Sequence, residues 1–263
     1  ALYNPKEAHL FDFGPELTIF LLAATITLCA GIVKGAVGFA MPMIMISGLA
    51  SFLPANEALA ALILPTLVTN IAQAMRQGFG AALATTYEYR RLLVTICVVI
   101  VLAAQIVPYV PQAALLMALG VPIVAFALSQ LGGWQLRFDA RNRGRAEILT
   151  GLVGGFYGGI SGVWGPPTIA LLTSLGVGKR ENIRVQGVVY LIGSAMLVIG
   201  HTGSGVLNAA TLPLSVILTV PAMAGLYAGF AIQDRLDAAR FSRWTLVVLA
   251  ITGLNLIRRA LGF

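Results

Sequence analysis

The chain has 263 residues, of which 58% are apolar and only 10% are charged, and its mean hydropathy is +0.89. A soluble domain carries roughly 25% charged residues, so the composition argues against an ordinary water-soluble enzyme or binding module. The net charge of +7 does not indicate nucleic acid as a partner, because the basic residues lie in short loops between apolar segments. We therefore expect one all-α polytopic membrane domain, which spans the bilayer several times.

Ten apolar segments follow one another along the chain, five on each side of a basic loop at residues 135–146. Some are long enough to cross a hydrocarbon core of about 30 Å, whereas others are short or rich in glycine and proline. The first set, within residues 17–134, consists of Leu17–Lys34, Ala36–Pro54, Glu57–Met75, Leu92–Val110 and Gln112–Trp134. The second set, within residues 147–261, consists of Glu147–Gly159, Ser161–Leu175, Ile183–Gly200, Val206–Ile232 and Trp244–Ile257.

One spacing of glycine and proline occurs twice, 124 residues apart. The series Gly31, Gly35, Gly38 and Pro42 recurs as Gly155, Gly159, Gly162 and Pro166, and Glu57 recurs as Glu181. This pattern indicates an internal duplication, with coincidence in a glycine-rich chain as the alternative. The glycines also predict that the first two segments of each set are broken or re-entrant helices, which are tolerated at membrane depth where protein or a cavity surrounds them.

The basic residues favour one side of the membrane. Short cytoplasmic loops carry an excess of Lys and Arg, and in each pair of matched loops only one member is basic. The two repeats are therefore predicted to cross the membrane in opposite directions, although Arg258 and Arg259 fall on the other side. Thirteen of the 17 Lys and Arg residues then lie in the cytoplasm, namely Arg76, Arg90, Arg91, Arg137, Arg141, Arg143, Arg145, Lys179, Arg180, Arg184, Arg235, Arg240 and Arg243. Inverted repeats with broken helices predict a secondary transporter with its site near the midplane.

The two glycine motifs are the predicted substrate site. The N-terminus of a helix carries roughly half a positive charge and free N–H groups, so two such ends meeting head to head would bind one small anion. The predicted binding residues here are Lys34, Gly35, Gly38, Gly159 and Gly162. The alternatives are close helix packing for the glycines and, for Lys34, an interaction with a helix C-terminus or with the membrane surface.

Four polar or aromatic residues are further candidates for the substrate site. Ser161 and Trp164 belong to the second motif, while Asn70 and Gln73 lie one helical turn apart on one face of the third segment. We expect them to line the cavity. The alternative for the polar side chains is hydrogen bonding that only holds neighbouring helices together.

Three titratable residues are candidates for coupling transport to protons. Glu57 and Glu181 each open a helix, where a carboxylate also interacts favourably with the helix dipole without any role in coupling. His201 lies near the end of its segment. Cys29 and Cys97 lie within apolar segments, so their spacing indicates neither a disulfide framework nor a metal site. We expect no cofactor and no catalytic residue, and the sequence does not specify the oligomeric state.

The glycine motifs also resemble a known family. Gly31-Ile-Val-Lys-Gly-Ala-Val-Gly-Phe-Ala-Met-Pro42 and Gly151-Leu-Val-Gly-Gly-Phe-Tyr-Gly-Gly-Ile-Ser-Gly-Val-Trp-Gly-Pro-Pro167 resemble the motifs of the TauE/SafE family of sulfite and organosulfonate exporters. The resemblance covers residues 17–261 and implies export of sulfite, sulfoacetate or a related small anion across a bacterial inner membrane. The first motif departs from the family pattern, because Phe39, Ala40 and Met41 precede its proline.

Other function classes remain as alternatives. An anion channel would need a continuous pore with rings of selectivity groups, and a transporter of another small organic anion would share the same site. A membrane-embedded enzyme is disfavoured, because the sequence shows no Ser/His/Asp constellation and no paired intramembrane carboxylates. A divalent-metal transporter is disfavoured because no His/Cys/Asp cluster lies within the apolar segments.

Overall fold

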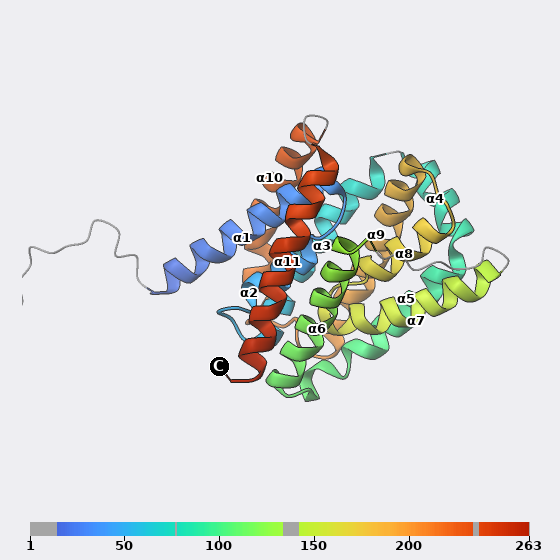
Figure 1. Ribbon diagram of the computed structural model, residues 1–263. Helices are drawn as coiled ribbons and strands as arrows, with labels where there is room; N and C mark the ends of the chain where they lie inside the picture. Colours follow the sequence, from blue (N-terminus) through green and yellow to red (C-terminus); the bar gives the residue numbers. More distant parts are fainter. Residues whose placement is uncertain (1–14, 77, 134–141, 234–236, 263) are drawn as a thin grey trace, which may run out of the picture.

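A computed structural model describes residues 15–76, 78–133, 142–233 and 237–262 (Figure 1). Within these residues the chain forms α-helices, one short 3-10 helix and no strand. Residues 1–14 and most of the basic loop, with Arg137 and Arg141, lie outside the described residues, as does Arg235. The elements are α1 Pro15–Val37, α2 Met41–Leu49, α3 Ala55–Met75, α4 Phe79–Glu88, α5 Arg90–Ala104, η1 Val107–Tyr109, α6 Gln112–Leu131, α7 Arg143–Ser161, α8 Gly165–Ser174, α9 Lys179–Gly203, α10 Leu212–Ile232 and α11 Ala238–Ala260.

The all-α membrane fold is confirmed, and each of the ten predicted segments corresponds to a helix. Six helices of the described chain, α1, α3, α5, α6, α9 and α10, are long and apolar enough to cross a membrane. By contrast, α2 has nine residues and α8 has ten, so each is about 15 Å long at 1.5 Å per residue. Both are half-helices, as the glycine and proline content of their segments predicted.

The backbone breaks only at the last glycine of each motif. The first segment of each set is therefore a continuous helix, α1 or α7, which corrects the expectation that it is broken. Gly38 has a φ of 88° and Gly162 a φ of 73°, a left-handed conformation that glycine adopts without steric cost. In each case the glycine N–H donates to the carbonyl four residues earlier, Lys34 or Gly158, at 2.7 Å. The two breaks therefore begin in the same way, but they differ two residues later, where Ala40 has a φ of 76° and Trp164 a φ of −120°.

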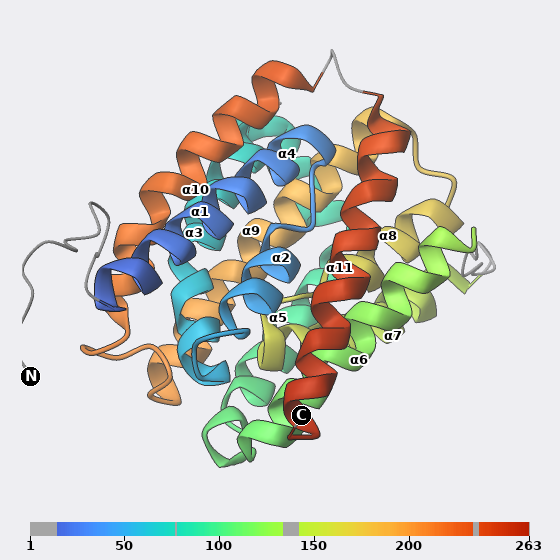
Figure 2. The same cartoon turned by 60° about the vertical axis from the view of Figure 1, so that its left-hand side comes forward.

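The remaining motif glycines lie inside helices and allow close packing. Gly35 of α1 faces α10, where a Cβ atom on it would overlap the Leu226 carbonyl oxygen and lie 2.8 Å from the Gly229 Cα. Gly159 of α7 faces α5, where a Cβ atom would lie 2.7 Å from the Ile100 carbonyl oxygen. Figure 1 shows α7 beside α5, and Figure 2 shows α1 beside α10.

The helix packing follows the duplication. The first helix of each half packs on a helix of the other half, since α1 contacts α10 and α7 contacts α5. The matched helices α3 and α9 pack on each other in the middle of the bundle, and α6 packs on α11. A larger share of the spans in α3 and α9, 67% and 56%, is buried than in the other spans. The opposite orientation of the two halves stays a prediction.

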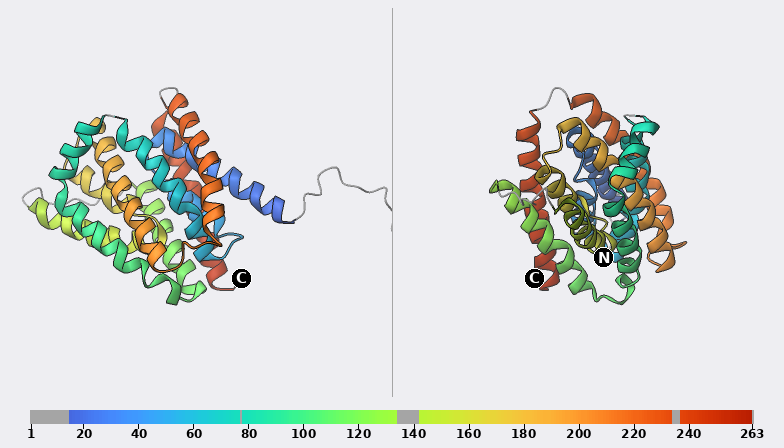
Figure 3. Two further views of the ribbon diagram at one scale, coloured as in Figure 1. Left: turned by 180° about the vertical axis from the view of Figure 1, so that it is seen from behind. Right: turned by 90° about the vertical axis from the view of Figure 1, so that its right-hand side faces the viewer.

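Helix α4 was not predicted and has no counterpart in the second half. It presents Phe79, Leu83 and Tyr87 to the outside, with 71%, 60% and 73% of these side chains exposed, while Ala82 and Thr85 are buried. It is drawn in teal at one end of the bundle (Figure 3). A search for membrane-length apolar segments overlooks it, because it is a ten-residue amphipathic helix.

Candidate functional site

A small cavity lies where the two half-helices begin. Its lining includes Ala40 and Pro42 from the start of α2, and Trp164 and Gly165 from the start of α8. The cavity measures about 30 Å³, and since one water molecule needs roughly 10–15 Å³, it has room for a few water molecules or one small ion. The structure thus brings together the two helix N-termini that the duplicated motif singled out.

Both half-helices direct few but well-placed backbone donors toward their N-terminal ends. Pro42 lies in the first turn of α2, and Pro166 and Pro167 lie in the first turn of α8. Proline is favourable there, because N–H groups in the first turn have no partner within the helix. The first-turn N–H groups without a partner within the helix are those of Met41 and Met43 in α2 and of Gly165 in α8, and Met43 and Gly165 line the cavity. The positive ends of two helix dipoles face the same small space.

Lys34 is the cation of this site. It lies in the last turn of α1 with only 2% of its surface exposed, so its side chain is buried within the protein. Its Nζ donates to Thr69 Oγ1 at 2.9 Å and to Asn70 Oδ1. An ammonium group has three donors, and among the described residues the third has no acceptor. Lys34 therefore has one N–H group without an acceptor in the described chain.

The partners of Lys34 are themselves held in place. Asn70 Nδ2 donates to the Tyr190 carbonyl at 2.9 Å and to Ser194 Oγ at 3.3 Å, which joins α3 to α9. Thr69 Oγ1 donates to the Pro65 carbonyl at 2.6 Å. These bonds orient the Asn70 and Thr69 oxygen atoms toward the lysine, so the ammonium group has a fixed position beside the cavity.

Trp164 also lines the cavity and has a donor without an acceptor. Its indole fits against Gly158 and Gly193, where an added Cβ atom would lie 2.8 Å from the ring, and it meets Tyr190 edge-on with centroids 6.3 Å apart. Only 2% of the Trp164 surface is exposed, yet its Nε1–H has no partner among the described residues. The buried Thr66 hydroxyl, also in the cavity wall, likewise has no partner within the described chain.

Four of the nine predicted binding residues line the cavity, namely Lys34, Asn70, Gly162 and Trp164. Two others support the backbone breaks instead of lining the cavity. Gln73 Nε2 donates to the Gly38 carbonyl at 3.0 Å, and Ser161 Oγ accepts the Val163 N–H at 3.1 Å. Gly35 and Gly159 lie at helix crossings, as described above.

The coupling candidates lie outside the cavity wall. Glu57 is exposed in the first turn of α3, and Glu181 lies in the first turn of α9, 4.0 Å from Arg184 Nη2. His201 is fully buried, and its Nε2 lies 2.9 Å from the Gly159 carbonyl oxygen. Because a carbonyl only accepts, this nitrogen donates, and His201 satisfies one of the carbonyl groups that the end of α7 leaves free.

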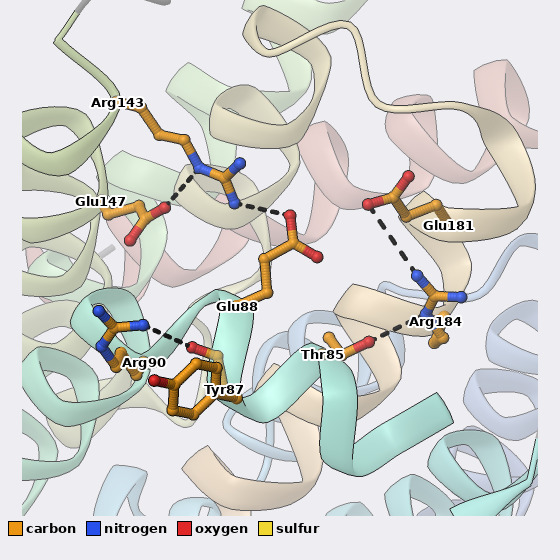
Figure 4. Close-up of polar contacts among 8 residues, drawn as sticks. All are labelled: Thr85, Tyr87, Glu88, Arg90, Arg143, Glu147, Glu181 and Arg184. Atoms are coloured by element: carbon orange, nitrogen blue, oxygen red, sulfur yellow. Dashed lines mark hydrogen bonds and ion pairs between the residues drawn. The ribbon is translucent and has the colours of Figure 1, made fainter. Parts of the chain in front are cut away.

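A polar network joins α4, α7 and α9 at one end of the molecule (Figure 4). Arg143 pairs with Glu88 at 3.0 Å and with Glu147 at 2.8 Å, while Arg184 Nε donates to Thr85 Oγ1 at 2.9 Å. Burial works against the charged form of Arg143, but the hydrogen bonds with Glu147 and Glu88 outweigh it and raise the pKa of Arg143. The network thus connects α4 with the starts of α7 and α9, next to the basic residues of the chain.

Sequence reasoning missed Thr66, Thr69 and Tyr190, although the duplication contained a signal for two of them. Thr66 and Tyr190 are 124 residues apart, the same separation as Asn70 and Ser194, whose side chains touch. Asn70 and Ser194 thus meet at equivalent positions of the third segments, and Thr66 and Tyr190 line the same cavity. The same separation relates Lys34 to Gly158 and Ala40 to Trp164, so the lysine and the indole have no like counterparts in the other half.

Comparison with known families finds one similarity. The model of the family described as sulfite exporter TauE/SafE matches residues 23–256, which is nearly the whole chain. The match covers both half-helices and every residue of the cavity wall. Comparison with curated proteins and with solved structures finds no match.

Proposed function

The chain belongs to the sulfite exporter TauE/SafE family of membrane transporters, and from this premise we propose that it exports a small sulfur-containing anion such as sulfite across a bacterial inner membrane. Transport would proceed as secondary transport, by alternating access to the cavity between α2 and α8. Protons are the candidate coupling ion. An organosulfonate is the nearest alternative substrate.

The observation that carries the proposal is a set of buried donors without acceptors around one small cavity. Lys34, Trp164 and Thr66 all line this cavity. In the described chain the Trp164 Nε1–H and the Thr66 hydroxyl have no partner, and the Lys34 ammonium group has two acceptors for its three donors. Buried polar groups almost always have a hydrogen-bond partner, so unpartnered donors point to a ligand that accepts. A small oxyanion accepts several hydrogen bonds in a compact volume.

The charge of the site suits an anion with up to two negative charges. Lys34 contributes one positive charge, and each of the two half-helix N-termini contributes roughly half a charge. Together they offset about two negative charges. The volume of about 30 Å³ favours sulfite over an organosulfonate with a long carbon chain, since a few water molecules already fill it.

The test is uptake of labelled sulfite into proteoliposomes, with and without an imposed pH gradient and with sulfate, acetate and chloride as competitors. We expect saturable flux that sulfur oxyanions inhibit most strongly. Unitary currents in a planar bilayer would instead identify a channel, and absence of sulfite flux would overturn the assigned substrate.

Replacing Trp164 with phenylalanine tests the site itself. The variant keeps an aromatic ring but loses the Nε1–H donor, and a hydrogen bond to a charged group contributes about 1.5–3 kcal/mol. We expect sulfite affinity to fall roughly 10-fold to 150-fold. Trp244→Phe is the matched control, because Trp244 is 70% exposed on α11. Equal affinity in the two variants would show that the indole does not bind the anion.

A further inference from the structure

A second, larger cavity forms an open groove between α6, α7 and α8. It has a volume of about 640 Å³ and lies in the range of roughly 300–1,000 Å³ that is usual for ligand sites. Its wall includes Pro122 and Phe126 from α6, Val153 from α7, and Pro167 and Ala170 from α8. The groove is distinct from the anion cavity, although α8 contributes to both walls.

The groove is apolar at one end and polar at the other. Pro166 and Pro167 lie at the start of α8, whereas Thr173 lies at the end of α8 and Ser129 and Gln130 lie at the end of α6. The polar end coincides with the start of α7 and the basic residues that follow α8, which the distribution of Lys and Arg assigns to the cytoplasm. The ligand that suits this gradient is amphiphilic, with its head toward the cytoplasmic surface.

A positive charge at the polar end of the groove indicates that the headgroup of this ligand is anionic. Arg145, Leu149 and Val153 follow one another at intervals of four residues on α7, so they share one face of the helix. Leu149 and Val153 line the groove with 53% and 60% of their surfaces exposed. Arg145 is exposed one turn closer to the cytoplasmic end, and no described carboxylate lies within 4 Å of it.

The other half of the molecule fills the equivalent space with protein. There α11 packs on α2, and Asn255 Nδ2 donates to Ser51 Oγ at 2.9 Å. On the α8 side, the groove separates α6 from α8, and an open apolar surface inside a bilayer is occupied by hydrocarbon. We propose that this groove binds one acyl chain of an anionic phospholipid, whose headgroup phosphate pairs with Arg145.

Native mass spectrometry of the purified protein with added phosphatidylglycerol or phosphatidylcholine of equal chain length tests the proposal. The wild type should retain phosphatidylglycerol preferentially, and Arg145→Gln should reduce this preference about fivefold. Arg240→Gln, which removes an exposed charge elsewhere, should keep it. Equal retention of the two lipids by the wild type would overturn the assigned headgroup site.

Filling the groove tests the acyl chain. Ala170→Trp, or Val153→Trp on the open side, should lower retention of both lipids at least tenfold. Val220→Trp is the control, because Val220 is 73% exposed on α10. Unchanged retention in a folded groove variant would refute the proposal. Labelling of Thr173→Cys by a charged thiol reagent, without protection by phosphatidylglycerol, would show a water-filled groove and also refute it.

Discussion

Replacing Lys34 with methionine separates a binding role from a structural one. Methionine is similar in size but uncharged, so the variant removes the ammonium group from beside Thr69 and Asn70. Without an anion, the lysine is a buried charge surrounded by neutral oxygen atoms, and burying such an ion costs several kcal/mol. Leaving one amide oxygen unpartnered costs only about 1–3 kcal/mol. We therefore expect the anion-free variant to unfold at the temperature of the wild type or above it.

Added sulfite should raise the unfolding temperature of the wild type more than that of the Lys34→Met variant. At 100 times its dissociation constant a ligand stabilises the folded state by about 2.7 kcal/mol. At roughly 2–4 °C per kcal/mol this raises the unfolding temperature of the wild type by about 5–10 °C. Loss of a buried charged partner costs about 2–5 kcal/mol of binding, so at the same concentration the variant should gain less than about 1 kcal/mol.

The assay is thermal unfolding of the detergent-purified proteins, followed by tryptophan fluorescence over a range of sulfite concentrations. Chloride at equal ionic strength is the control for nonspecific salt effects. A sulfite-dependent shift of wild-type size in Lys34→Met would show that the lysine does not contact the anion. A variant that unfolds well below the wild type without sulfite would show that Lys34 mainly stabilises the fold.

Three other predictions follow from the fold. Ala40 caps α2 with a φ of 76°, a strained conformation for a residue with a Cβ atom, so Ala40→Gly should raise the free energy of unfolding by roughly 1 kcal/mol in a denaturant or thermal titration. A methyl group at Gly35 would overlap the backbone of α10, so Gly35→Ala should destabilise by about 1–3 kcal/mol, whereas Gly80→Ala, which meets open space, should not. Glu57→Gln and Glu181→Gln should leave any pH-gradient dependence of flux intact, because neither carboxylate lines the cavity. Loss of that dependence in proteoliposomes would identify them as coupling residues.

The duplicated motif was the most informative part of the sequence. Its spacing predicted the two half-helices, and the structure places their N-termini around one cavity. The motif did not reveal which glycines break the backbone and which pack, since both uses require the absence of a side chain. Gly38 and Gly162 differ from Gly35 and Gly159 only in φ and in what lies opposite them. Both properties depend on tertiary structure.

The cavity wall was only partly predictable for the same reason. Lys34, Asn70 and Trp164 are unusual within apolar segments, and a search for such residues finds them. Thr66 and Tyr190 are unremarkable in sequence, and their role depends on α3 and α9 meeting in the middle of the bundle. Applying the separation of 124 residues to the third segments would have paired them.

The unlike contributions of the two halves limit how such a site can be assembled. Two copies of the first half, joined about the contact of α3 with α9, would bring two ammonium groups to a cavity of about 30 Å³, where they would repel each other strongly. Two copies of the second half would bring two indoles and no cation. A single chain with both halves can place one lysine and one tryptophan in the same cavity wall, so a single side chain sets the formal charge of the site.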